Sequence, residues 1–337
     1  DMENPTPIST PPRSALRLPV SLRTRLILAN ILVVAAAIAA LGFYVYYRGQ
    51  QSNAYLANEL EANLRQKAVD TLTTTSQAHA DTLNGIFTNV SRQITNVGAS
   101  ASALLARQSL LDSGAYWSAS DEMARLPNGS WDNMDWTEPA SVFVPARQEL
   151  TEPLARELNT LKQLDFTVPT LLKTNSDIVA IYYGGPQGET LYYPNVDLAR
   201  IVPPDFDVTT RPWYLAAMPK NNPRRATVWS APYLDAALHG LVITSSSPVF
   251  DTYTGFRGVV AMDVQLVRMN ALVSGIRIGK TGYAFVIDGQ GRLISMPEAG
   301  YKDLGYATDV MPLGDPIDQD KLPAPLPADL AAVMARM

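Results

Sequence analysis

A group of charged and aromatic residues in the second half of the chain has the composition of a site for a small zwitterion. Arg211 supplies a guanidinium that can bind a carboxylate through two parallel hydrogen bonds. Asp263 ends an otherwise apolar stretch, where a carboxylate is costly to bury unless a cation pairs with it. Trp213, Tyr214 and Tyr233 supply rings that exclude water and can face an ammonium group. These residue types predict a site for a molecule that carries both a carboxylate and an amine.

A second interpretation stays open from the residue types alone. In it, Arg211 and Asp263 pair with each other or with the backbone, and the aromatic side chains belong to the core. Catalysis is not indicated, because no nucleophile is placed beside a base. The two histidines, His79 and His239, are far apart in the sequence, which argues against a histidine metal site or a Ser-His-Asp triad. We therefore expect no enzyme activity, catalytic residue, metal or cofactor in this chain.

Length and composition limit the kinds of protein that the chain can be. Its 337 residues are enough for two ordinary domains, or for one large domain with an anchor. The net charge of −5, without a Lys/Arg cluster, argues against a nucleic-acid partner. Cysteine is absent, so neither disulfides nor thiolate metal sites can contribute.

Residues 26–47 carry no charge and are predicted to form one transmembrane helix. A helix of that length reaches roughly 33 Å, enough for a hydrocarbon core of about 30 Å. Four arginines precede it and one follows closely, which predicts a cytoplasmic N-terminus and an extracytoplasmic chain after about residue 48. The alternative, a cleaved signal peptide, normally has a shorter apolar region of about 7–15 residues. Residues 1–25 are interpreted as a disordered cytoplasmic tail.

A long helix is predicted over residues 48–111, because apolar residues recur every three or four positions and proline is absent from 51 to 111. Leu56, Leu60 and Leu64 belong to this stripe. The helix can pack on its own domain, or it can pair with a second copy and conduct a signal to the membrane. Both can hold, since one helix can present two stripes.

Beyond the long helix the sequence alternates between helical and β-rich segments. Residues 145–165 have helical spacing, and the pattern then changes to strands. The predicted strands are at 177–183, 190–193, 226–234, 241–250 and 256–266. They predict an antiparallel sheet with helices to one side, an α+β fold.

A second hairpin pattern indicates a second, smaller module. Residues 282–297 repeat the order of 177–194: a strand, predicted over 282–288, then a glycine-rich turn, a second strand and a proline. The predicted modules are therefore 112–266 and 267–337, the second ending in a helix after the proline-rich 312–327. We expect this second module to be incomplete.

Four motifs, in order, resemble the double Cache (dCache) extracytoplasmic sensor domains of bacterial transmembrane receptors. They are Arg211-Pro-Trp-Tyr214, Ala231-Pro-Tyr-Leu-Asp235, Gly255-Phe-Arg-Gly-Val-Val-Ala-Met-Asp263 and Gly279-Lys-Thr-Gly-Tyr283. The resemblance covers the chain from about residue 49 to its end. It implies a long N-terminal helix and two modules with PAS-like antiparallel sheets. The membrane-distal module, 112–266, would bind ligand, and the membrane-proximal module is 267–337.

The resemblance also implies a set of binding residues. The amino-acid-binding subset of the family has a Tyr upstream of an Arg-x-Trp-Tyr run, a Tyr on the next strand and an Asp on a later strand. The matching positions here are Phe206, Arg211, Trp213, Tyr214, Tyr233 and Asp263. Phe206 stands where the subset has tyrosine, which removes a hydroxyl that could bind a ligand carboxylate.

The resemblance implies a receptor of the bacterial inner membrane that senses a small ligand, an amino acid, and whose output domain lies beyond this chain. We expect a homodimer through the N-terminal helix, with ligand closure shifting that helix relative to its partner. Two alternatives stay open: a sensor for a polyamine, purine or organic acid, and a structural dimerisation domain without ligand.

Overall fold

The computed structural model describes residues 21–251, 255–278, 282–287 and 292–305. Most of the predicted N-terminal tail, the helix predicted after 312–327 and part of the Gly279–Tyr283 motif lie outside these residues. The chain divides into two units, residues 1–71 and 72–337. The described part of the first unit is the beginning of one long helix, and the second unit contains the rest of that helix and the sheet.

The long helix α1, Leu22–Leu105, is continuous, so the predicted membrane helix and the predicted long helix are one element. The prediction that this helix reaches residue 111 is wrong. Arg107 N–H donates to the carbonyl of Leu104, which is three residues back, and this tighter hydrogen bond closes the helix. A short helix, α2, then begins at Gln108.

The other elements follow in a mixed order of helices and strands. The further helices are α2 (Gln108–Leu111), α3 (Ala119–Glu122), α4 (Glu152–Leu161), α5 (Val168–Thr174), α6 (Leu198–Ile201), α7 (Pro212–Ala217), α8 (Leu266–Ser274) and α9 (Glu298–Asp303), with 3₁₀ turns η1 (Lys162–Phe166) and η2 (Val208–Thr210). The strands are β1 (Ala124–Arg125), β2 (Trp131–Asp132), β3 (Ser141–Val144), β4 (Ala180–Gly184), β5 (Thr190–Tyr193), β6 (Val228–Trp229), β7 (Tyr233–Leu234), β8 (Leu241–Phe250), β9 (Phe256–Gln265), β10 (Arg277–Ile278), β11 (Gly282–Tyr283), β12 (Val286–Ile287) and β13 (Leu293–Ser295).

The helix predicted over 145–165 is shorter at its start. It begins at Glu152, with Thr151 before it in an extended conformation and Pro153 in its first turn. Proline is favoured there because the first turn leaves backbone N–H groups without partners in any case. The helix ends at Leu161, and a 3₁₀ turn continues to Phe166.

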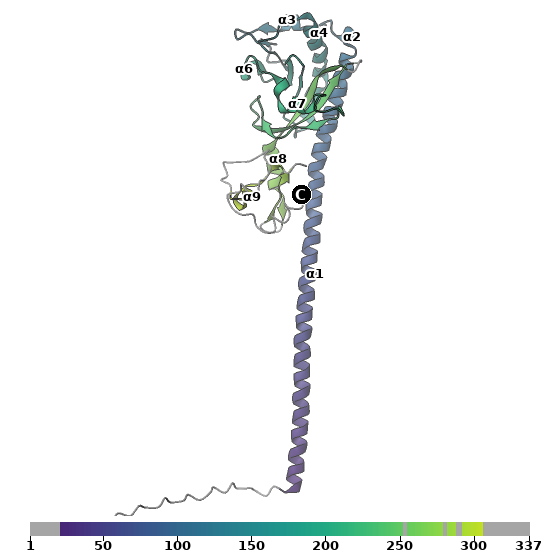
Figure 1. Cartoon of the computed structure of the whole chain (residues 1–337), viewed down its shortest axis with the longest axis vertical. Coiled ribbons are helices and arrows are strands. Elements are labelled where there is room, and N and C mark those ends of the chain that lie inside the picture. The colour runs from purple at the N-terminus through teal and green to yellow at the C-terminus, as the bar shows by residue number, and fades with distance from the viewer. Residues whose placement is uncertain (1–20, 252–254, 279–281, 288–291, 306–337) are drawn as a thin grey trace, which may run out of the picture. The chain divides into compact units, whose positions relative to one another are not determined.

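Within the described residues, the strands from β1 to β9 form one nine-stranded antiparallel sheet in the order β1-β2-β3-β5-β4-β9-β8-β6, with β7 also paired to β8. Its centre, β5-β4-β9-β8-β6, has the PAS-like order 2-1-5-4-3 when these strands are numbered along the chain. The predicted α+β class with a PAS-like antiparallel sheet is confirmed. Figure 1 shows this sheet beside the C-terminal part of α1.

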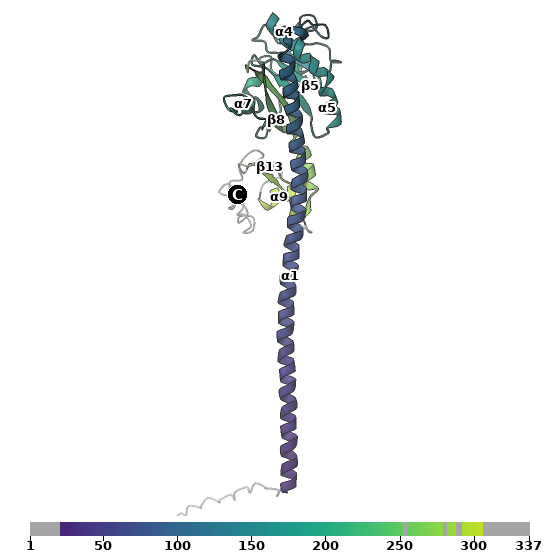
Figure 2. The same cartoon turned by 90° about the vertical axis from the view of Figure 1, so that its right-hand side faces the viewer.

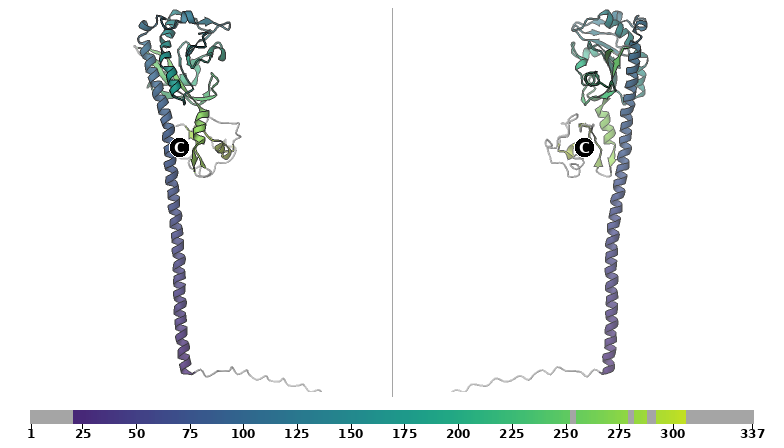
Figure 3. Two further views of the ribbon diagram at one scale, coloured as in Figure 1. Left: turned by 180° about the vertical axis from the view of Figure 1, so that it is seen from behind. Right: turned by 45° about the vertical axis from the view of Figure 1, so that its right-hand side comes forward.

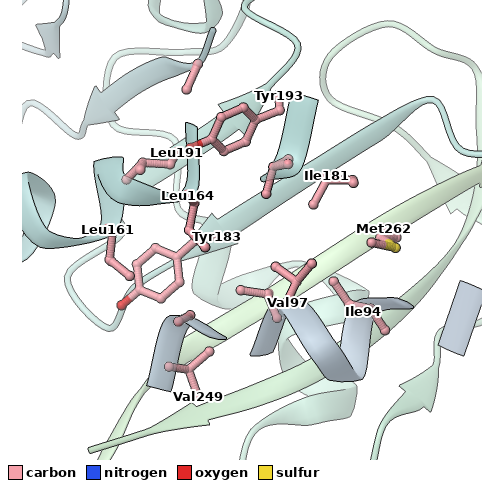
Figure 4. Close-up of a cluster of buried hydrophobic side chains, with 14 of the residues drawn as sticks. Ile94, Val97, Leu161, Leu164, Ile181, Tyr183, Leu191, Tyr193, Val249 and Met262 are labelled. Carbon is pink, nitrogen blue, oxygen red and sulfur yellow. The ribbon is translucent and has the colours of Figure 1, made fainter. Parts of the chain in front are cut away.

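One face of the sheet packs on α1. Val90, Ile94 and Val97 of the helix are buried against Tyr183 and Met262 of the central strands. Figure 2 shows α1 crossing this face, and Figure 4 shows Ile94 and Val97 directed toward the same core as these strand residues. The helix therefore shares a core with the sheet. This agrees with the expectation that the long helix packs on its own domain.

Gly98 lets α1 approach the sheet closely. A Cβ at this position would lie 2.8 Å from the Ser247 hydroxyl and 3.3 Å from a methyl group of Val260. At such distances a side chain at this position would require Ser247 of β8 and Val260 of β9 to shift. The glycine that interrupts the helical pattern is thus the point at which helix and sheet meet most tightly.

The opposite face of the sheet carries a second core. Side chains alternate between faces along a strand, so Tyr182, Val259 and Ala261 point away from α1. They pack against α6 and α7, through Leu198 and Trp213. The two views of Figure 3 show α1 on one side of the sheet only. The second face is therefore available to build a site.

The second predicted module is described only in part. After α8, β10 pairs with β11 and β12 pairs with β13 in two small antiparallel sheets. The single strand predicted over 282–288 is wrong, because Gly282–Tyr283 and Val286–Ile287 pair with different strands. The predicted return strand is present as β13.

Candidate ligand-binding site

A small cavity lies on the sheet face that is opposite α1. Its volume is about 20 Å³, which is room for roughly one water molecule. Its walls come from β4, β5, α6, α7, the segment 206–211 and the turn after β7. The lining residues are Tyr182, Thr190, Tyr192, Leu198, Phe206, Val208, Arg211, Trp213, Tyr233, Asp235, Ala236 and Ala237. Four of the six predicted residues, namely Phe206, Arg211, Trp213 and Tyr233, line it, and the structure holds it closed.

Asp263 lies behind this cavity, in the middle of the sheet. It pairs in register with Ala180 of β4 and with Thr244 of β8. Its side chain is fully buried, and Oδ1 accepts hydrogen bonds from Tyr182 Oη at 2.7 Å and from Thr244 Oγ1 at 2.6 Å. Oδ2 has no hydrogen-bond partner among the described residues. A buried carboxylate oxygen without a partner is costly, and an ammonium group would satisfy it.

Burial also determines the protonation of this carboxyl group. Loss of solvation, and after it the negative charge of Asp235, raise the pKa of Asp263 to about 7 in all. The hydrogen bonds from Thr244 and Tyr182 oppose the shift. Without a bound cation, the carboxyl is therefore partly protonated near neutral pH.

Two tyrosines connect Asp263 to the cavity. The hydroxyls of Tyr182 and Tyr233 are 3.3 Å apart, and the Tyr233 hydroxyl is 2.7 Å from Thr244 Oγ1. Burial raises the pKa of both tyrosines well above the ordinary value, so both hydroxyls stay protonated. Tyr182 also stacks on Tyr192, with ring centroids 5.2 Å apart. These rings exclude water, and their hydroxyls extend the polar end of the site.

Arg211 stands at the start of α7. Asp207 accepts a hydrogen bond from Thr209 N–H at 2.9 Å and begins the 3₁₀ turn, and Pro212 then starts the helix. Arg211 Nη2 donates to the Leu234 carbonyl at 2.8 Å. Its guanidinium lies 5.8 Å and 5.4 Å from the ring centroids of Phe206 and Tyr233. Phe206 thus contacts the cation with its ring and not with a hydroxyl.

Of the second interpretation, the pairing of Arg211 with Asp263 is not present in the described part of this structure, whereas the expected pairing of Arg211 with the backbone is. Among the described residues, Arg211 hydrogen-bonds a carbonyl and Asp263 hydrogen-bonds hydroxyl groups. Each therefore contacts backbone or neutral groups and has an unmatched charge at or beside the same cavity.

Trp213 and Tyr214 point in different directions. Trp213 lines the cavity and meets Tyr182 edge-on, with ring centroids 4.9 Å apart. Tyr214 does not line the cavity and packs edge-on against Phe256, at 6.0 Å. Consecutive residues of a helix point about 100° apart, so both rings cannot face one small cavity. In this closed structure Tyr214 therefore lies in the core beside the cavity and does not line it, and its role in ligand binding stays a prediction.

Asp235 and His239 are not among the predicted site residues, yet both lie at the cavity. Asp235 lines the cavity, and its Oδ2 lies 2.8 Å from His239 Nδ1. That nitrogen is also 3.2 Å from the Tyr192 hydroxyl. Asp235 is the last residue of the Ala231–Asp235 motif and lies directly after the strand predicted over 226–234. His239 is distant in the sequence from His79, which argues against a metal site or a triad. The sequence contains no signal that brings His239 to Asp235.

Two larger cavities contain none of the predicted ligand residues. One, of about 1040 Å³, is lined mostly by apolar residues, including Leu83, Phe87 and Ile294. The other, of about 500 Å³, has polar walls that include Glu157, Glu189 and Arg257. Volume does not decide the site here, because the small cavity is where a cation, a buried carboxylate and aromatic rings meet.

The N-terminal part of α1 has the properties of a membrane span. An 18-residue window in this helix has a mean hydropathy of 2.6 and is 0% buried. Among the described residues, α1 is the one helix long and apolar enough to cross a membrane. This property fits membrane anchoring.

Comparison with known families identifies the class of the site-bearing segment. Residues 148–271 match the family described as methyl-accepting chemotaxis protein-like, first PDC sensor domain. The matched segment includes every residue that lines the small cavity, and it includes Asp263. The family that this segment matches is a family of sensor domains. The resemblance to receptor sensor domains is confirmed for this segment.

Curated relatives agree with this class. The chain is 32% identical over 135 residues to the methyl-accepting chemotaxis protein McpC of Bacillus subtilis. The aligned residues are 40% of this chain and 19% of McpC. The chain is 32% identical over 143 residues to PctB of Pseudomonas aeruginosa, covering 42% and 21%. The chain thus spans about a fifth of the length of these relatives.

Solved structures of chemoreceptor domains are also similar in part. The ligand-binding domain of the amino acid chemoreceptor PctB of Pseudomonas aeruginosa, in complex with L-Gln, has a TM-score of 0.34 at 28% identity, over 42% of this chain and 57% of that domain. The domain of CtaA of Pseudomonas fluorescens, in complex with L-isoleucine, has a TM-score of 0.30 at 26% identity, over 36% and 46%.

Proposed function

We propose that this chain is the sensor part of a membrane-anchored chemotaxis receptor and that its cavity binds an amino acid. One observation carries the proposal: the buried Asp263 has an unpartnered oxygen and is hydrogen-bonded to Tyr182, which lines the same cavity as Arg211. An amino acid supplies an ammonium group for Asp263 and a carboxylate for Arg211. The match of residues 148–271 to a chemotaxis sensor domain supports the receptor role.

The proposed binding energy comes mainly from charged hydrogen bonds. Each contributes about 1.5–3 kcal/mol, and every 1.4 kcal/mol changes the dissociation constant about tenfold. Arg211 would bind the carboxylate, while Asp263 and Asp235 would bind the ammonium group. The neutral hydroxyls of Tyr182 and Tyr233 would orient it. The curated relative PctB is an amino acid chemoreceptor, which agrees with this choice of ligand.

Binding requires the site to open. Ligand pockets usually measure about 300–1,000 Å³, whereas the closed cavity has about 20 Å³. The turn from Asp235 to Gly240 forms part of the wall and joins β7 to β8. We propose that this turn moves to admit ligand and closes over it.

The test is calorimetric titration of the full chain in detergent with the twenty amino acids and with two partial analogues. L-Alanine is compared with ethylamine, which lacks the carboxylate, and with propionate, which lacks the amine. We expect saturable binding of amino acids and at least tenfold weaker binding of both analogues, because each loses one charged contact. Equal binding of ethylamine would favour an amine sensor, and equal binding of propionate an organic-acid sensor. If a cooperatively folded protein binds none of these compounds, and neither adenine nor spermidine, the result would favour a structural dimerisation domain without ligand.

We further propose that the receptor is a homodimer through α1, with its N-terminus in the cytoplasm and the chain after about residue 48 outside. Leu56, Leu60 and Leu64 are 57%, 60% and 59% exposed and lie along one stripe of the helix. The chain has no cysteine, so any disulfide formation or maleimide labelling comes from the introduced cysteine. Leu60→Cys should form a disulfide-linked dimer in membranes and, in intact cells, react with a membrane-impermeant maleimide.

Asn58→Cys is the matched control, because it lies on the opposite side of the same helix. It should react with the maleimide equally well but form little disulfide. Equal crosslinking at both positions would reject the stripe as the interface, and protection of both from the reagent would reject the orientation.

A further inference from the structure

We infer that His239 is an internal competitor of the ligand: its imidazole occupies the place beside Asp235 that the ligand's ammonium group takes. This inference rests on the proposed function and adds a residue that controls affinity and its response to pH. Ligand entry then exchanges one cationic partner of Asp235 for another.

The first support is the contact itself. His239 Nδ1 lies 2.8 Å from Asp235 Oδ2, and the His239 backbone N–H donates to the same oxygen at 3.3 Å. The imidazole is nearly parallel to the Tyr192 ring, with an interplanar angle of 11° and centroids 6.4 Å apart. Asp235 and Tyr192 both line the cavity. The imidazole therefore covers the carboxylate at the site where an ammonium group would approach.

The second support is that the cavity must enlarge and that His239 belongs to a turn with an exposed tip, Leu238. Tyr182 and Tyr192 belong to central strands and are 4% exposed, so they move only with the sheet. In the turn, Leu238 is 79% exposed and has φ +69°, and Gly240 has φ +79°. A turn with an outward apolar side chain and left-handed backbone has little packing to lose when it moves.

The third support is the charge around the imidazole. Asp235 of the same turn is hydrogen-bonded to His239, Tyr192 of β5 donates or accepts at the same nitrogen, and Asp263 of β9 adds a second negative charge. Gln265 of β9 donates to the His239 carbonyl at 2.9 Å and carries no charge. The hydrogen bond to Asp235 raises the pKa of His239, although burial opposes this. A protonated imidazole thus competes with the ligand most strongly in mild acid.

The pH dependence has a defined sign. When the ligand displaces His239 into solvent, the imidazole returns toward its ordinary pKa of about 6.5 and releases a proton. Ligand affinity therefore rises as pH increases through the raised pKa of His239. Ionisation of Asp263, whose pKa is about 7, has the same sign. A variant at His239 is required to separate the two contributions.

The experiment compares the full chain with its His239→Gln variant, using L-alanine in calorimetry from pH 5.5 to 8.5. Glutamine keeps a hydrogen-bond donor for Asp235 and removes the charge. We expect His239→Gln to bind L-alanine about tenfold more tightly at pH 6, and the difference to shrink at pH 8.5, as expected for loss of one charged hydrogen bond. His79→Gln, which changes the other histidine of the chain, should behave as the unmodified protein.

Two results would overturn the inference, and they differ in what else they reject. If His239→Gln binds L-alanine with unchanged or weaker affinity and unchanged pH dependence, His239 is not a competitor, while amino acid binding stands. If neither protein binds L-alanine or any other amino acid, the inference fails together with the proposed function. Binding of L-alanine by the variant alone would support both.

Discussion

Asp263→Asn is expected to weaken amino acid binding by at least about tenfold and, in the same protein, to raise the stability of the ligand-free state at pH 8. The native pKa of Asp263 is about 7, above its ordinary 3.8, because burial penalises the charged form. The stability that this group contributes is full below pH 4 and is lost as pH rises through about 7. At pH 8 the ligand-free protein therefore holds a buried negative charge with one unpartnered oxygen.

Asparagine removes that charge but places an amide N–H₂ where Oδ2 was. We expect a net gain of about 1–3 kcal/mol in the free energy of unfolding at pH 8 and little difference at pH 5. The affinity for L-alanine should fall by about 10- to 150-fold, because one charged hydrogen bond is lost. Urea unfolding at both pH values and calorimetric titration measure the two effects.

Asp205→Asn is the control, because Asp205 is exposed and outside the cavity. It should change neither stability nor affinity. A loss of stability in Asp263→Asn at both pH values would contradict the expectation, since it would mean that the carboxylate is satisfied in the ligand-free protein. The expected result, a gain in stability together with a loss of affinity, is common where a binding site contains a buried charge that only the ligand neutralises.

Arg211→Ala is expected to have the largest effect on affinity with the smallest effect on folding. Truncating one member of a desolvated charge pair costs about 2–5 kcal/mol, so L-alanine should bind at least about 30-fold more weakly. Ethylamine, which has no carboxylate, should bind the variant and the unmodified protein alike. Because Arg211 is only partly buried and makes one hydrogen bond to a carbonyl in the described structure, unfolding should change by less than about 1 kcal/mol.

The L-alanine affinity of Arg211→Lys should lie between those of Arg211→Ala and the unmodified protein. Lysine keeps the positive charge, but its ammonium group cannot form the two parallel hydrogen bonds of a guanidinium. Arg200→Ala is the charge-matched control, since Arg200 is exposed on α6 and pairs with Asp197. If Arg211→Ala left L-alanine affinity unchanged, the carboxylate would bind elsewhere. If it weakened L-alanine and ethylamine equally, the substitution would have disturbed the cavity as a whole.

Much of the fold could be predicted from local patterns in the chain. The strands at 190–193 and 241–250 have the predicted bounds, because their β-rich composition ends at turn residues on both sides. The long helix was predictable from its apolar period and from the absence of proline. Its end at Leu105 was not, because a three-residue hydrogen bond closes it and no proline or glycine marks the place.

The candidate site was predictable only for residues that share a short segment. Arg211, Trp213 and Phe206 reach the cavity from one stretch of chain, and the motif around Tyr233 follows closely. The direction of Tyr214 depended on where α7 begins, which set it on the side away from the cavity. The difference between Trp213 and Tyr214 comes from the angle of about 100° between consecutive helix residues, and not from residue type.

The amino-acid sequence by itself thus determined the class of fold, a helix long and apolar enough to cross a membrane, and the residue types of the proposed zwitterion site. Only the tertiary structure decided which groups meet there. Tyr182 and Thr244 reach Asp263 through the registers of β4 and β8 with β9, and His239 reaches Asp235 through a turn with left-handed backbone. The alternation of side chains along a strand predicts the face that a residue occupies. It does not predict its neighbours, because strand register depends on contacts between residues that are distant in the sequence.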